Sequence, residues 1–127
     1  MWKPVLFLIA ALNGLNALIM WFAPQYWYDT VPGVAMMGPL NFHFVRDIAL
    51  VFGMSAGALA WGAVKLDRTA AVIGATWPCL HALFHIWIWA THRGAPFDQI
   101  AFVNLAGIQL PAWAALTAAF KFRTREI

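Results

Sequence analysis

Charged residues are scarce in this sequence, and cysteine is almost missing. Only 10% of the 127 residues are Asp, Glu, Lys or Arg, against about 25% in soluble domains. A soluble domain of this length has too little interior to hide 63% hydrophobic residues, so we expect lipid to be the solvent of this chain. The single cysteine, Cys79, excludes an intramolecular disulfide framework and any CxxC redox or zinc motif.

Motifs of soluble enzymes and of nucleic-acid binding are missing too. The sequence contains no nucleophile–base motif, phosphate loop or nucleotide fingerprint, which argues against a hydrolase triad and leaves open whether the chain is an enzyme. The net charge of +3 does not indicate nucleic acid, because the basic residues gather at the ends of apolar segments. No A-x-A cleavage site follows the first apolar run, which is therefore expected to be retained as a helix.

Four apolar segments are long enough to cross a bilayer, which takes about 20 residues. The connections between the later segments are short, and short connections make neighbouring helices antiparallel. The sequence thus predicts an all-α fold, with residues 1–127 forming a single membrane domain that is an antiparallel four-helix bundle. The predicted transmembrane helices are residues 4–23, 40–64, 69–91 and 98–120, with an interfacial loop at residues 24–39.

The distribution of basic residues predicts the orientation of this bundle. One side collects most of them, whereas the loops of the other side hold only Arg93, with Asp29 and Asp98 nearby. By the positive-inside rule both termini are expected in the cytoplasm and the loop of residues 24–39 outside. The basic residues on the cytoplasmic side are Lys3, Lys65, Arg68, Lys121, Arg123 and Arg125.

Two pairs of metal-competent side chains stand four residues apart within the apolar segments, His43 with Asp47 and His81 with His85. Residues at this spacing share one face of a helix. Ionisable groups inside a membrane are costly, at roughly 2.5–3.5 kcal/mol for a central charge, and they are functional candidates for that reason. If the two faces meet, the four side chains make one metal site.

Two asparagines are predicted at the same depth in the membrane as these side chains, which strengthens the prediction of a polar site. Counting inward from the outer helix ends places Asn16, Asp47, His85 and Asn104 at one level, roughly 10 Å below the outer boundary. Asn16 and Asn104 are expected to help bind the cofactor by orienting imidazoles or a bound water.

Several occupants suit such a site. Imidazole and carboxylate ligands favour Zn, Cu or Fe, and His43 with His85 is a candidate axial pair for haem. A quinone headgroup hydrogen-bonded by histidine and aspartate is a further alternative. The structural alternative is that the histidines merely hydrogen-bond across helices.

The first apolar segment ends in FAPQYWYDTVPG, and the second opens with Asn41-x-His43-x-x-Arg46-Asp47 before a run rich in Gly and Ala. In this layout the chain resembles the DoxX-like small four-helix membrane proteins of bacteria, although His81 and His85 do not match that family's pattern. The resemblance covers most of the chain. It implies the bacterial inner membrane and association with quinol-oxidising or other respiratory machinery.

Three functions follow as hypotheses. The first is a membrane protein that binds a transition metal or redox cofactor near its outer face. The second is a structural accessory subunit of an electron-transfer complex. The third is a small membrane enzyme or quinone-binding protein that uses a His/Asp acid–base pair. The expected partners are the lipid bilayer and either a larger membrane complex or further copies of the chain, without nucleic acid.

Overall fold

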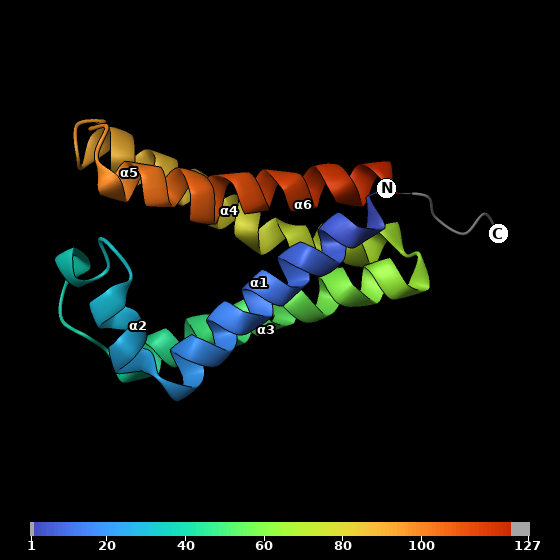
Figure 1. Ribbon diagram of the computed structural model, residues 1–127, viewed down its shortest axis with the longest axis horizontal. Coiled ribbons are helices and arrows are strands. Elements are labelled where there is room, and N and C mark those ends of the chain that lie inside the picture. Colours follow the sequence, from blue (N-terminus) through green and yellow to red (C-terminus); the bar gives the residue numbers. More distant parts are fainter. Residues whose placement is uncertain (1, 123–127) are drawn as a thin grey trace.

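The computed structural model describes residues 2–122, most of them in helices (Figure 1). Four helical segments are long and apolar enough to cross a membrane, and each begins and ends within two residues of its predicted span. The predicted all-helical fold with four long apolar helices is thus confirmed. The segments are α1 (Lys3–Phe22), α3 (Phe42–Lys65), α4 (Arg68–Thr91) and a composite helix made of α5 (Gln99–Asn104), the π-helical turn η2 (Leu105–Gln109) and α6 (Leu110–Lys121).

The segment between the first two long helices is partly helical. It contains α2 (Pro24–Thr30) and the 3-10 turn η1 (Ala35–Met37). Gly33 and Gly38 have positive φ angles of 91° and 130°, which favour glycine and let the chain turn. A Cβ atom on Gly33 would lie 3.0 Å from Ile100 Cγ2, so this segment lies directly against α5.

Short polar residues begin the later helices. The side chains of Asn41, Asp67 and Asp98 each accept a hydrogen bond from a backbone N–H of the first turn of α3, α4 and α5. Leu66 ends α3 in a left-handed conformation, with φ of 59°. The turn Leu66-Asp67 therefore reverses the chain within two residues.

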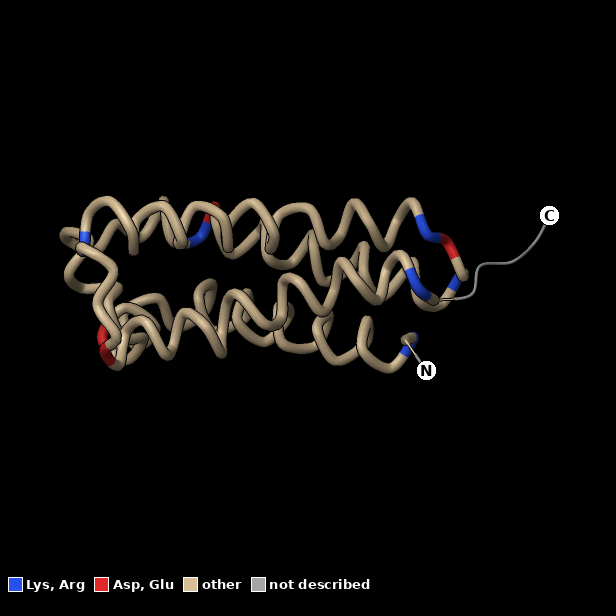
Figure 2. The backbone as a smooth tube through the Cα atoms, turned by 90° about the horizontal axis from the view of Figure 1, so that it is seen from above, with Lys and Arg blue, Asp and Glu red and all other residues tan. Residues whose placement is uncertain are grey.

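Consecutive long helices run back and forth, so their ends gather at two ends of the molecule (Figure 1). We call the end with the N-terminus the terminal end, and the opposite one the α2–α5 end. Around the molecule α1 contacts α3, α3 contacts α4, α4 contacts α6, and α6 returns to α1. Lys and Arg residues gather at the terminal end, and one adjacent pair of opposite charges, Arg46 and Asp47, lies within a helix (Figure 2).

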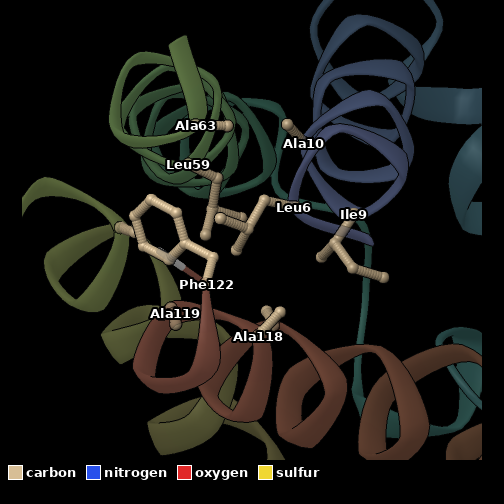
Figure 3. Close-up of a cluster of buried hydrophobic side chains, with 11 residues drawn as sticks. Leu6, Ile9, Ala10, Leu59, Ala63, Ala118, Ala119 and Phe122 are labelled. Atoms are coloured by element: carbon tan, nitrogen blue, oxygen red, sulfur yellow. The ribbon is translucent and has the colours of Figure 1, made fainter. Parts of the chain in front are cut away.

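The hydrophobic core is continuous only toward the terminal end. There one cluster of buried residues draws on all four long helices, with Leu6, Leu59 and Phe122 meeting at its centre (Figure 3). Toward the α2–α5 end the buried residues fall into two separate clusters. One contains Met20, Val45 and Ala49 and joins α1 to α3. The other contains Cys79, Ala82 and Ala112 and joins α4 to α6. The helices thus act as two pairs at this end.

Small residues hold α3 against α4. A Cβ atom on Gly62 would lie 2.6 Å from the backbone nitrogen of Ala71, and one on Gly74 would lie 2.7 Å from that of Leu59. Such close backbone approach is typical of helices that pack in membranes. Larger residues at Gly62 or Gly74 would force the two helices apart.

A series of hydrogen bonds also crosses the contact between α3 and α4. Pro78 has no N–H to donate to the carbonyl of Gly74, four residues earlier. The Ser55 hydroxyl donates to this carbonyl at 2.6 Å, and it accepts a hydrogen bond from Asn13 Nδ2 at 3.1 Å. Asn13 and Ser55 are buried, so α1, α3 and α4 are joined by hydrogen bonds where proline frees a backbone oxygen.

Substitution of two glycines of α3 tests the close contact. Gly62→Ala places a methyl group against the Ala71 backbone and should destabilise the fold by about 1–3 kcal/mol. Gly57→Ala is the matched control, because a Cβ atom on Gly57 would have no neighbour within 4 Å, and alanine is the better helix former by about 1 kcal/mol. Thermal unfolding in detergent should therefore show a lower midpoint for Gly62→Ala only. Equal midpoints for the two variants would contradict the close approach.

Candidate functional site

His43 and Asp47 form a pair on the outward face of α3. His43 Nε2 lies 3.4 Å from Asp47 Oδ2, and the two side chains are 89% and 57% exposed. The buried face of α3, which includes Val45, Ala49 and Ser55, lies on the opposite side of the helix. This face packs inward because its residues are small or apolar, so His43 and Asp47 point away from the other helices.

His81 and His85 lie on the inner side of α4 and are half-buried. Their ring centroids are 4.5 Å apart at an interplanar angle of 67°, which is an edge-to-face contact. His81 also stacks on Trp77 at 5.4 Å and meets the Phe52 ring of α3 edge-on at 5.8 Å. The first histidine is thus held at the α3–α4 contact, at the level where the two helix pairs begin to separate.

Asn104 completes this group from the composite helix. Its side chain lies beside the His85 imidazole, and its Nδ2 donates to the Ile100 carbonyl at 2.9 Å. Its Oδ1 is buried and has no hydrogen-bond partner within residues 2–122, and the same holds for Nε1 of Trp77. We call the residues Trp77, His81, His85 and Asn104 the histidine site.

The Asn16 side chain forms its hydrogen bonds at the end of α1 rather than with the histidine site. Its Oδ1 accepts a hydrogen bond from Trp27 Nε1 at 3.2 Å, and its Nδ2 donates to Met20 Sδ at 3.3 Å. The side chain therefore fastens α2 onto the end of α1. Of the two asparagines predicted at the level of the histidines, the structure brings only Asn104 to them.

The predicted four-ligand metal centre is not formed. Among the described residues no three side chains of His, Cys, Asp or Glu are grouped so that they would hold a metal ion. Catalytic and structural zinc sites use three or four converging protein ligands, whereas His81 and His85 offer two rings in edge-to-face contact. The haem pair His43 and His85 is not supported either, because His43 lies on the outward face of α3. The described residues therefore form neither the predicted four-ligand metal site nor the predicted haem pair.

Two residues of this region were not predicted from the sequence. Trp77 precedes His81 by one turn on the same face, a spacing that the sequence does contain. Gln109 ends the π-helical turn η2, donates from Nε2 to the Ala82 carbonyl at 2.7 Å and accepts from Trp113 Nε1 at 3.1 Å. It joins the composite helix to α4 at Ala82, the residue after His81. Isolated π-helical turns occur frequently at functional sites.

A local departure from helical periodicity determines where Gln109 points. The π-helical turn η2 adds one residue to a turn directly after Asn104. Every side chain beyond it is rotated by about 100° relative to a regular helix. A projection with about 3.6 residues per turn therefore misplaces Gln109, whose contact with Ala82 sets the distance between α4 and the composite helix. The turn precedes Pro111, whose ring and missing N–H disfavour a regular helix at this point.

An ion pair closes the connection between the two helices that carry the histidine site. Arg93 donates two hydrogen bonds to the Asp98 carboxylate. Asp98 also begins α5 by accepting from the backbone N–H of Ala101 at 2.9 Å. The guanidinium of Arg93, and then the Ala101 N–H, hold the pKa of Asp98 below its ordinary value.

Comparisons of the chain with protein-family models, with curated proteins and with solved structures found no match. The resemblance to DoxX-like proteins therefore stays a prediction from the sequence. A function has to be inferred from the geometry of the site.

Replacing Asp98 by asparagine tests the contribution of its charge. Asparagine keeps the helix cap but loses the ion pair with Arg93, so the thermal midpoint at pH 7 should fall. Because the pKa of Asp98 is lowered by folding, its contribution exists above the ordinary value of about 3.9 and is lost as the pH falls through the folded value. The difference between wild type and Asp98→Asn should therefore shrink in acid. An undiminished difference at a pH of about 2 would contradict this role.

Proposed function

We propose that the protein is a multi-pass membrane protein whose histidine site binds the polar head of a lipid-soluble small molecule. Four helices of sufficient length and hydropathy support membrane insertion. Large apolar side chains such as Leu8, Phe22 and Phe102 are exposed along the outside, where lipid would cover them.

The positions of the charges support an orientation. Lys3, Lys65, Arg68 and Lys121 stand at the terminal ends of the four long helices. The positive-inside rule then places the terminal end in the cytoplasm. In a bacterial inner membrane the α2–α5 end, with the histidine site, would face the periplasm.

The observation that carries the binding function is the pair of unpartnered polar atoms beside the histidines. Trp77 Nε1 is a buried donor and Asn104 Oδ1 a buried acceptor, and neither has a partner among the described residues. Leaving such a group unsatisfied costs about 1–3 kcal/mol. Two of them, at opposite ends of the His81–His85 contact, indicate a place where a ligand's own polar groups complete the hydrogen bonds.

The chemistry of these atoms favours a particular kind of ligand. The Trp77 N–H needs an acceptor such as a carbonyl oxygen, whereas Asn104 Oδ1 needs a donor such as a hydroxyl. Neutral imidazole offers both functions through its two ring nitrogens. A flat ring with hydroxyl groups on opposite sides, as in a quinol, supplies both partners, because each hydroxyl can accept and donate a hydrogen bond. Such a ring also suits the aromatic side chains of Phe52, Trp77 and His81.

The packing of the helices is consistent with this position. At the α2–α5 end the α1–α3 pair and the α4–α6 pair have separate apolar clusters. The histidine site lies on the side of α4 that contacts both α3, through Phe52, and the composite helix, through Asn104. A ligand there would be reached from the lipid without crossing the continuous core at the terminal end.

A binding titration with a short-chain quinol, kept reduced, tests the proposal. Wild-type protein in detergent should bind the quinol saturably, as followed by tryptophan fluorescence. Trp77→Phe, which removes one hydrogen bond to the ligand, should weaken the affinity by about two- to tenfold. Trp61→Phe is the matched control, because Trp61 is exposed on α3 beside Lys65.

A second variant separates binding from folding. Asn104→Leu removes a buried unpartnered oxygen, so the ligand-free protein should keep its stability or gain about 1 kcal/mol. Its affinity for the quinol should fall, because the quinol hydroxyl loses its acceptor. Saturable binding that is equal in wild type, Trp77→Phe and Asn104→Leu would overturn the assignment of the site. Failure of the wild type to bind any quinol saturably would overturn the ligand class.

A further inference from the structure

The outward surface of α1 and α3 carries features that the histidine site does not use. A groove of about 530 Å³ runs between the two helices. Its floor is made of small residues, since a Cβ atom on Gly14 would lie 3.7 Å from the Cβ of Ala56, and one on Gly53 would lie 3.9 Å from that of Ala17. Its rims carry exposed Leu18, Leu50 and Met54. We call this surface the α1–α3 face.

Two opposite charges stand at the α2–α5 end of the groove. Arg46 and Asp47 lie about 6–8 Å along the axis from the first residue of α3. Arg46 donates from Nε to the Trp21 carbonyl at 3.3 Å, and the Asp47 carboxylate has His43 as its neighbour. Successive residues on a helix point about 100° apart, so Arg46 and Asp47 do not face each other.

In a membrane this arrangement is incomplete. An outward carboxylate on a lipid-facing surface is costly and is normally paired or turned inward. The charges of Arg46 and Asp47 are adjacent, opposite and separated by only about 1.5 Å in height along the helix. A two-fold axis parallel to the helices keeps every residue at its own depth. Such an axis therefore places Arg46 of each copy at the same depth as Asp47 of the other, so that two equivalent ion pairs can form.

We propose that a second copy of this chain docks on the α1–α3 face, forming a two-fold dimer within the membrane. The two Arg46–Asp47 pairs fix its register at the α2–α5 end. Leu18, Leu50 and Met54 of each copy pack into the groove of the other. A second copy is preferred over an unrelated helix because the pattern is self-complementary, as an interface between identical surfaces requires.

Cysteine crosslinking in native membranes tests which surface is covered. In a Cys79→Ser background, Met54→Cys should form disulfide-linked dimers when Cu(II)-phenanthroline is added. Leu80→Cys on α4 is the matched control, because the two native side chains are 62% and 58% exposed. Both positions also lie about 17 Å along the axis from the α2–α5 end of their helices. Equal crosslinking at the two positions, or crosslinking of Met54→Cys to a different protein, would overturn the proposal.

Charge reversal tests the pairing itself. Arg46→Asp gives each copy two acidic residues and Asp47→Arg gives it two basic ones, so each variant alone should dimerise at least about tenfold more weakly than wild type. Two differently tagged chains, one with each substitution, should co-purify when expressed together, because their charges are again complementary. The double variant Arg46→Asp with Asp47→Arg should dimerise as wild type does. Single variants that dimerise normally, or mixed chains that fail to pair, would overturn the proposal.

Discussion

The close approach of α3 and α4 is the contact on which the other features of the fold depend. Gly62 and Gly74 bring the two backbones together, and the carbonyl that Pro78 frees on Gly74 is bonded by Ser55. A buried carbonyl without a hydrogen bond would be costly, so this bond from α3 compensates for the proline. Asn13 extends the same hydrogen-bonded chain to α1. Three of the four long helices are thereby fixed at one level.

This contact divides the molecule into two halves with different packing. On its terminal side, alanines such as Ala63, Ala71 and Ala118 let all four helices close around Leu6 and Leu59. On the other side larger residues, Phe52 and Trp77 among them, fill the α3–α4 contact. The helix pairs have separate clusters there. The half with less shared core is also the half that holds the unpartnered polar atoms.

The sequence was sufficient to predict the helices but not their rotation. Apolar runs long enough to cross a bilayer, separated by short connections, gave the four spans to within two residues. Depth followed from counting, which placed His85 and Asn104 at one level, and they do lie side by side. The face that each helix buries is set by where its small residues fall. On α3 these are Ala49, Ser55 and Gly62, so the stripe of His43 and Asp47 is turned outward.

Asn16 and Asn104 differ in whether their side chains are fully hydrogen-bonded. Asn16 and Asn104 are the same residue type at the same predicted depth. Asn16 has both its oxygen and its nitrogen bonded within the α1–α2 corner, whereas the Asn104 oxygen has no partner among the described residues. A polar group in an apolar helix is retained either because it holds helices together or because it meets a ligand. Asn16 satisfies the first condition. The unpartnered oxygen of Asn104, directly before the π-helical segment and beside His85, is the atom that the proposed ligand would meet.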